Sequence, residues 1–187
     1  MENILKVINL QTDFLAACVR DRRLGLGVLG YGAGAFAFTF FINFSSGCGI
    51  FSFIMQAVMY FILFVFAGLL FAALTQMFLD LTSKTGNAPG LFALVGISEF
   101  AKLLLTAGAL IAAAAGAGLV INSMIFVFVF ICQIIFLINL VARAYNMPMG
   151  AVFFSMVLTV IPSLFAAVLL ICAGLAAFVA LIFGLAR

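Results

Sequence analysis

Five stretches of the sequence are long and apolar enough to cross a lipid bilayer, and they limit what the chain can fold into. The hydrocarbon core of a bilayer is about 30 Å thick and an α-helix rises about 1.5 Å per residue, so a crossing helix needs about 20 apolar residues. The stretches cover residues 24–44, 50–79, 91–115, 119–141 and 150–175, with an apolar tail that runs to residue 187. They predict an all-α integral membrane protein built as a bundle of five transmembrane helices.

The composition agrees with burial in lipid. Hydrophobic residues make up 68% of the 187 residues and charged residues only 7%, whereas soluble domains carry about 25% charged residues. No Pro/Ser-rich linker, low-complexity tract or long run of charge divides the chain. We therefore expect residues 1–187 to form a single membrane domain, with the lipid bilayer as its first partner.

Basic residues predict the orientation of the spans, because short loops rich in Lys and Arg stay in the cytoplasm. Three flanks of the stretches are basic, and an odd number of spans puts all three on one side of the membrane. The residues concerned are Lys6, Arg20, Arg22, Arg23, Lys84 and Arg143. The loops SSGCG and AGAG on the other side carry no charge. The pattern predicts a cytoplasmic N-terminus and a C-terminus outside.

Residues 1–23 have the pattern of a short amphipathic helix before the first span. Apolar residues recur at near-helical spacing from Ile4 to Cys18, with polar and charged residues between them. One interpretation is a cytoplasmic helix that lies on the membrane interface, with its basic residues near anionic headgroups. The other interpretation is that the same apolar face packs against the bundle.

Glu99 and Lys102 stand inside the third stretch. Counted from residue 91, they lie about 12 and 17 Å deep, near mid-membrane, where an unpaired charge costs about 2.5–3.5 kcal/mol on insertion scales. Their spacing of three residues places them on one helix face, within reach of an ion pair. Gln133 and Thr159 fall within a helical turn of the same depth in the fourth and fifth stretches. We therefore predict an intramembrane polar cluster of Glu99, Lys102, Gln133 and Thr159.

The sequence leaves three interpretations of this cluster open. It fixes helix register as a self-satisfied structural unit, it lines a functional polar cavity, or Lys102 alone snorkels to the cytoplasmic surface. Pro162, about one turn beyond Thr159, frees a backbone carbonyl and predicts a kink in the fifth stretch near the same level. That kink either opens a cavity or shapes the packing.

Small residues at four-residue spacing predict where helices approach each other closely. Lipid tails are as apolar as Leu, so helices associate in a bilayer through close backbone contact and a few polar contacts. The small residues with this spacing are Gly30 and Gly34 in the first stretch and Gly108, Ala112 and Gly116 in the third. We expect them to pack helices within one chain, with a homo-oligomer as the alternative.

Residue types that common membrane chemistries need are missing from the sequence. The chain has no His, which excludes a Ser–His pair, and intramembrane aspartyl chemistry needs two Asp whereas only Asp80 lies near a span. The segment SKTGNAPG lacks the Gly-Lys-Ser/Thr ending of a phosphate-binding loop. Four scattered cysteines are expected to be apolar packing residues: Cys18, Cys48, Cys132 and Cys172. We expect no enzyme activity, catalytic residue, metal site, cofactor or nucleic-acid partner.

Two segments resemble a known family. In DFLAACVRDRRLGLGVLGYGAG an amphipathic lead-in with basic residues precedes a Gly-rich first span, and LFAALTQMFLDLTSKTGNAPGLFALVGISEFAKLL holds a span, a short polar loop and a third span. This order is similar to the Yip-one domain family, the Ypt/Rab-interacting polytopic membrane proteins, over residues 14–175. The resemblance implies five spans and a cytoplasmic N-terminus.

The chain departs from the family pattern in its third span. Family members often carry Gly-Tyr followed by Pro, whereas here Ile97 follows Gly96, and Ala101 or Lys102 stands at the position of the Pro. The Asp-Leu-Tyr-Gly-Pro motif of eukaryotic members is also absent. These departures weigh against a Rab-type GTPase as partner and favour a bacterial member in the inner (cytoplasmic) membrane.

Two functions follow from these features. The resemblance implies a non-enzymatic multi-pass membrane protein that acts in membrane organisation or trafficking through contacts with lipids, other membrane proteins or a second copy. The polar cluster favours the alternative of a small transporter, channel or lipid-translocating component whose path includes Glu99 and Lys102. A water-accessible cavity at these two residues separates the hypotheses, because a dry and paired cluster argues against transport.

Overall fold

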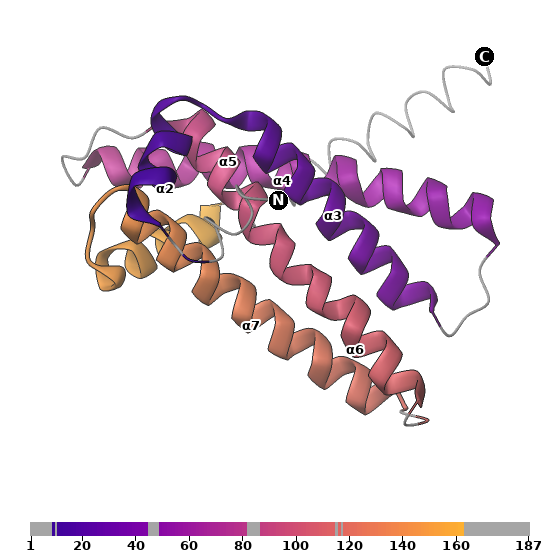
Figure 1. The fold of residues 1–187 in the computed structure, drawn as a ribbon. Coiled ribbons are helices and arrows are strands. Elements are labelled where there is room, and N and C mark those ends of the chain that lie inside the picture. Colours follow the sequence, from indigo (N-terminus) through magenta and orange to yellow (C-terminus); the bar gives the residue numbers. More distant parts are fainter. Residues whose placement is uncertain are drawn as a thin grey trace, which may run out of the picture.

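The structure, a computed structural model, describes residues 11–44, 49–81, 87–114 and 118–162, together with residues 9 and 116. These residues form helices and short connections, with no strand among them. The elements are α2 (Thr12–Arg20), α3 (Leu24–Asn43), α4 (Ile50–Leu81), α5 (Ala88–Ser98), the 3-10 segment η1 (Glu99–Lys102), α6 (Leu103–Ala114) and α7 (Leu119–Ala144). A last helix covers Met149–Pro162. In Figure 1, α5 runs into α6 as one rod, with α7 alongside it.

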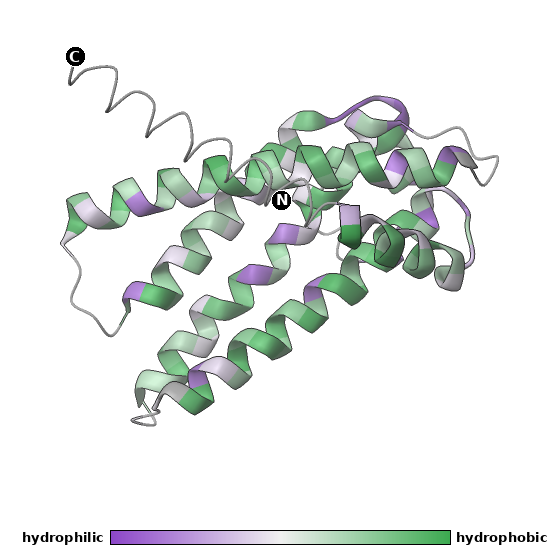
Figure 2. Ribbon diagram, turned by 180° about the vertical axis from the view of Figure 1, so that it is seen from behind, coloured by the Kyte–Doolittle hydropathy of each residue, from purple (hydrophilic) through white to green (hydrophobic). Residues whose placement is uncertain are grey.

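Among the described residues, four helices are long and apolar enough to cross a membrane: Leu24–Asn43, Ile50–Asp80, Ala88–Ala114 and Val120–Ala144. Hydrophobic residues dominate all four in Figure 2, and large apolar side chains cover their outer faces, as at Ile50, which is 80% exposed. By length and composition this is a multi-pass membrane protein. The helix at Met149–Pro162 is a shorter apolar one. Residues 163–175 and the tail lie outside the described residues, so the fifth span and a kink at Pro162 stay predictions.

The third membrane helix begins at Ala88, three residues before the predicted start. Asn87 provides the reason, because its side chain caps the helix by accepting a hydrogen bond from the Gly90 N–H at 3.4 Å, and Pro89 stands in the first turn. At the other end the helix stops at Ala114. Gly116, expected on its packing face, lies instead in the following turn with φ +60°, a left-handed conformation that favours glycine. The prediction that Gly116 packs helices is therefore wrong.

Helix α2 lies against the bundle. Its apolar face, which includes the fully buried Leu15 and Cys18, contacts α5 and α7. The Asn87 side chain also donates a hydrogen bond to the Val19 carbonyl at 2.9 Å. Within Thr12–Arg20 the apolar face therefore packs against the bundle, which is one of the two interpretations of the sequence. Residues 1–8 and 10 lie outside the described residues, and a position on the membrane interface stays a prediction.

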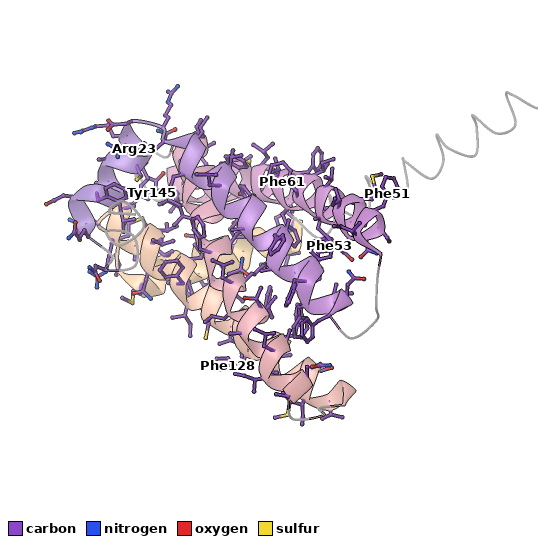
Figure 3. All side chains as sticks on the ribbon, turned by 45° about the vertical axis from the view of Figure 1, so that its right-hand side comes forward. Arg23, Phe51, Phe53, Phe61, Phe128 and Tyr145 are labelled. Atoms are coloured by element: carbon purple, nitrogen blue, oxygen red, sulfur yellow. The ribbon has the colours of Figure 1, made fainter. Side chains whose placement is uncertain are left out.

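The basic flanks of the first and fourth spans lie at the same end of the molecule. Tyr145, directly after α7, donates a hydrogen bond from its hydroxyl to the Asn87 carbonyl at 3.4 Å, and Figure 3 shows Arg23 at this end, far from Phe51. Burial raises the pKa of Tyr145 to about 12, while the bond to Asn87 acts in the opposite direction. The hydroxyl therefore keeps its proton, and its bond to Asn87, at neutral pH.

Helix α3 and helix α5 approach each other through glycine. A Cβ on Gly30 would collide with the backbone carbonyl of Gly96, and a Cβ on Gly27 would lie 2.7 Å from the Ala93 Cα. The fully buried Tyr31 locks the same contact, because its hydroxyl donates to the Phe92 carbonyl at 3.2 Å. Gly30 thus packs two helices within the chain, as expected.

The small residues of the third stretch also pack inside the chain. A Cβ on Gly108 would lie 2.5 Å from the Ile125 side chain of α7, and Ala112 is buried. Gly108 and Ala112 therefore form part of the contact between α6 and α7.

Substitution of Gly30 by Ala should destabilise the protein by about 1–3 kcal/mol, because the added methyl group meets backbone atoms that cannot rotate away. The measurement is unfolding of the purified protein in mild detergent. Gly32→Ala is the matched control, since it changes the same helix at a position where a Cβ meets nothing within 4 Å. Equal stability of the two variants would contradict the close packing of α3 on α5.

Candidate functional site

The predicted ion pair forms in the middle of the third membrane helix. Lys102 Nζ lies 2.6 Å from Glu99 Oε2, and the four residues from Glu99 to Lys102 adopt 3-10 geometry between α5 and α6. A 3-10 helix has three residues per turn, so the side chains at positions i and i+3 stand directly above one another. The local tightening of the helix therefore aligns Glu99 and Lys102 better than a regular α-helix would.

Gln133 of α7 joins this pair. Its Nε2 donates a hydrogen bond to Glu99 Oε1 at 2.8 Å, so the two oxygens of one carboxylate face two different helices. Glu99 is 6% exposed and Gln133 is 9% exposed. We call these three residues, Glu99, Lys102 and Gln133, the Glu99 cluster.

Gly34 of α3 makes room for the carboxylate. A Cβ at this position would lie 2.7 Å from Glu99 Oε2 and 3.0 Å from the Glu99 Cβ. The packing glycine and the polar cluster, predicted separately from the sequence, thus belong to one contact.

Aromatic rings of α3, α4 and α7 lie next to the cluster. Lys102 Nζ stands over the Phe64 ring, 3.6 Å from its centroid, a distance typical of a cation–π contact. The Phe38 ring packs against Tyr60, Phe64 and Phe126 with centroid separations of 4.8, 5.7 and 6.0 Å. The Lys102 ammonium is therefore held by Glu99 on one side and by an aromatic ring on another.

Thr159, the fourth predicted member, makes its hydrogen bonds elsewhere. Its hydroxyl donates to the Ser155 carbonyl at 2.8 Å in its own helix and accepts from the Thr75 hydroxyl of α4 at 3.3 Å. Both threonines are buried. Residues beside Thr75 enclose a small apolar gap between α4, α5, α7 and the last helix that has no room for a water molecule. Thr159 therefore belongs to a second, separate polar contact.

Sequence reasoning missed several residues that hold the site in place. Phe64 gave no signal, because it is one of 24 Phe residues and spacing along α4 does not reveal which one faces Lys102. Gly27 and Gly96 are glycines in apolar stretches, but neither belongs to a four-residue repeat of small residues. Asn87 carried the recognisable signal of an N-cap residue two positions before Pro89.

The chemical capacity of the site is limited to a carboxylate, an ammonium and an amide. Among the residues that the structure describes, no group of three or more His, Cys, Asp and Glu side chains is arranged to hold a metal ion. The Lys102 side chain is only 13% exposed and pairs with Glu99 inside the bundle. It therefore does not snorkel to the surface.

Comparison of the chain with protein-family models, curated proteins and solved structures finds no match.

Removing either charge of the Glu99–Lys102 pair should destabilise the protein more than removing both. Glu99→Gln or Lys102→Met alone leaves a buried charge without its partner, and breaking a buried pair this way costs about 3–5 kcal/mol. The double variant should recover most of that loss, as measured by unfolding in mild detergent.

Thr106→Val is the matched control for this double-mutant cycle. Thr106 lies one turn further along, and among the described residues its hydroxyl donates only to the Leu103 carbonyl of its own helix, at 2.6 Å, so its loss should change stability little. If the losses of the two single variants simply add in the double variant, the pair is not energetically coupled and the cluster does not hold the helices in register.

Proposed function

We propose that the protein is a non-enzymatic, multi-pass membrane protein of the Yip-one type, a bacterial member that acts in membrane organisation through helix and lipid contacts. The family part of this proposal rests on the sequence resemblance over residues 14–175, and the observation that carries the structural role is the pairing inside the Glu99 cluster. The Glu99 carboxylate pairs with the Lys102 ammonium and accepts a hydrogen bond from the Gln133 amide, and the ammonium also lies over the Phe64 ring. In this proposal the cluster is an internal structural element that fixes the register of α3, α7 and the third membrane helix.

The outer surface of α4 supports action through contacts in the membrane. Helix α4 packs mainly against α3 and α5, and most of its apolar residues are not buried inside the chain. Its exposed side includes Phe51 and Ile62, at 76% and 59% exposure. This side is available to lipid, to another membrane protein or to a second copy.

The proposed location is the inner membrane, with the N-terminus in the cytoplasm and the C-terminus outside. Support comes from the basic residues at one end, because Lys and Arg near span ends stay on the cytoplasmic side. Arg20, Arg22 and Arg23 precede α3, and Arg143 lies in the last turn of α7.

Cysteine labelling in intact cells tests this orientation. In a background without native cysteines, Gly118→Cys before α7 should react with a membrane-impermeant maleimide, while Asn146→Cys after α7 should react only once the cells are opened. Both positions are exposed and they flank the same span, so each serves as the control for the other. The reverse pattern would invert the topology, and labelling of both from outside would remove α7 as a crossing helix.

One observation favours the alternative of a small transporter or channel. Ionisable residues inside a membrane helix often mark an ion or substrate path, and a 3-10 segment within a helix often marks a hinge. Glu99 and Lys102 combine both features. On this hypothesis the pair opens during a transport cycle and exchanges its partners with the transported species.

Flux into sealed proteoliposomes separates the two functions. We expect vesicles that contain the purified protein to take up protons and monovalent ions no faster than empty vesicles of the same lipids, and Glu99→Gln to behave like the parent protein. Incorporation and orientation are measured on the same vesicles. A flux that requires the protein and disappears in Glu99→Gln, while Thr106→Val retains it, would replace our proposal with the transport alternative.

A further inference from the structure

The hydrogen-bonding capacity of the Glu99 cluster is not used up by its own members. Gln133 Oε1 is buried and has no hydrogen-bond donor among the residues that the structure describes, and the buried Glu99 Oε2 has only its ion-pair contact with Lys102 there. Buried amide oxygens of this kind are nearly always paired, with protein or with an ordered water molecule. Gln133 is more than nine-tenths buried, so bulk water does not supply this donor.

Lys102, in turn, has an N–H donor without an acceptor. An ammonium group carries three N–H donors, and two of its directions are accounted for by Glu99 Oε2 at 2.6 Å and by the Phe64 ring at 3.6 Å. No third partner lies in the described part of the chain. One acceptor on Gln133 and one donor on Lys102 are thus left over within a group in which both residues contact the same carboxylate.

We infer that the Glu99 cluster is a binding site for one internal water molecule, which accepts a hydrogen bond from Lys102 Nζ and donates one to Gln133 Oε1. With this water the polar groups form a closed ring: Lys102 donates to the water, the water donates to Gln133 Oε1, Gln133 Nε2 donates to Glu99 Oε1, and Lys102 also donates to Glu99 Oε2. Its second hydrogen remains available to Glu99 Oε2. Three hydrogen bonds are the usual number for a buried water.

The chemistry of the cluster selects water over other small occupants. A metal cation would satisfy Gln133 Oε1 but would stand beside the Lys102 ammonium, whose charge repels it. A lipid acyl chain would leave both polar groups without partners, at a cost of about 1–3 kcal/mol for each. Water both donates and accepts, so it alone among these satisfies the surplus on both residues.

Solid-state NMR of the protein in lipid bilayers tests this site. The chain has three lysines, at positions 6, 84 and 102, so the parent for this test carries Lys6→Arg and Lys84→Arg and leaves Lys102 as the only ¹⁵N-lysine signal. We expect a cross-peak between Lys102 Nζ and a water proton that exchanges with bulk water much more slowly than the surface hydration does.

Gln133→Met is the decisive variant, because methionine keeps a similar length and removes the acceptor. The cross-peak should be lost in Gln133→Met and retained in Gln56→Met, which changes an amide that pairs with Asn43 at the far end of α3 and α4. Gln133→Leu serves as a second apolar variant, and circular dichroism checks that each variant is folded.

Three results would overturn the inference. The first is a parent protein without any water cross-peak at Lys102. The second is a cross-peak that persists unchanged in folded Gln133→Met or Gln133→Leu. The third is exchange with bulk water as fast as at the surface, which would mean a water-filled path instead of one enclosed molecule. The first two leave the proposed function standing, whereas the third favours the transport alternative.

Discussion

The close contact between α3 and the third membrane helix is the interaction on which the rest of the structure depends. Lipid gives helices no hydrophobic reason to associate, so they need surfaces that fit. Gly27 and Gly30 meet the backbone of Ala93 and Gly96, and a side chain at position 27, 30 or 96 would collide with the facing helix. One turn further along, Gly34 continues the same face and leaves the space that the Glu99 carboxylate fills. The apolar contact therefore positions the polar one.

The Glu99 cluster in turn adds polar contacts between the third membrane helix and its neighbours α7 and α4. The carboxylate takes its hydrogen bond from Gln133 on α7, and the ammonium beside it stands over Phe64 on α4. Together with the Phe38 ring, which packs against Phe64 of α4 and Phe126 of α7, this cluster links α4 and α7 to the centre of the bundle. A charge pair is costly in lipid by itself, but here each charge has a fixed partner, and wrong helix registers would separate them.

The sequence predicted what depends on composition and on spacing within one helix. Long apolar runs marked four helices, and the three-residue spacing of Glu99 and Lys102 indicated their pairing. What it could not provide was the direction in which each helix faces its neighbours. Depth counting placed Thr159 level with Glu99, yet Thr159 turns towards Thr75, because depth contains no information about rotation around the bundle. Nothing in the sequence indicated the 3-10 turn at Glu99–Lys102.

The two functions considered for this chain differ in whether the Glu99–Lys102 pair must stay closed or must open. Separating Glu99 from Lys102 without a substitute partner costs about 3–5 kcal/mol, and the same motion would release Gln133 and uncover the space beneath Gly34. In a transport cycle, binding of the transported species would have to offset the free-energy cost of separating the pair in every turnover. A protein that works by presenting its outer surface has no such requirement, and it benefits from helices that stay in register. The arrangement of the cluster is therefore better suited to holding the bundle together than to opening it.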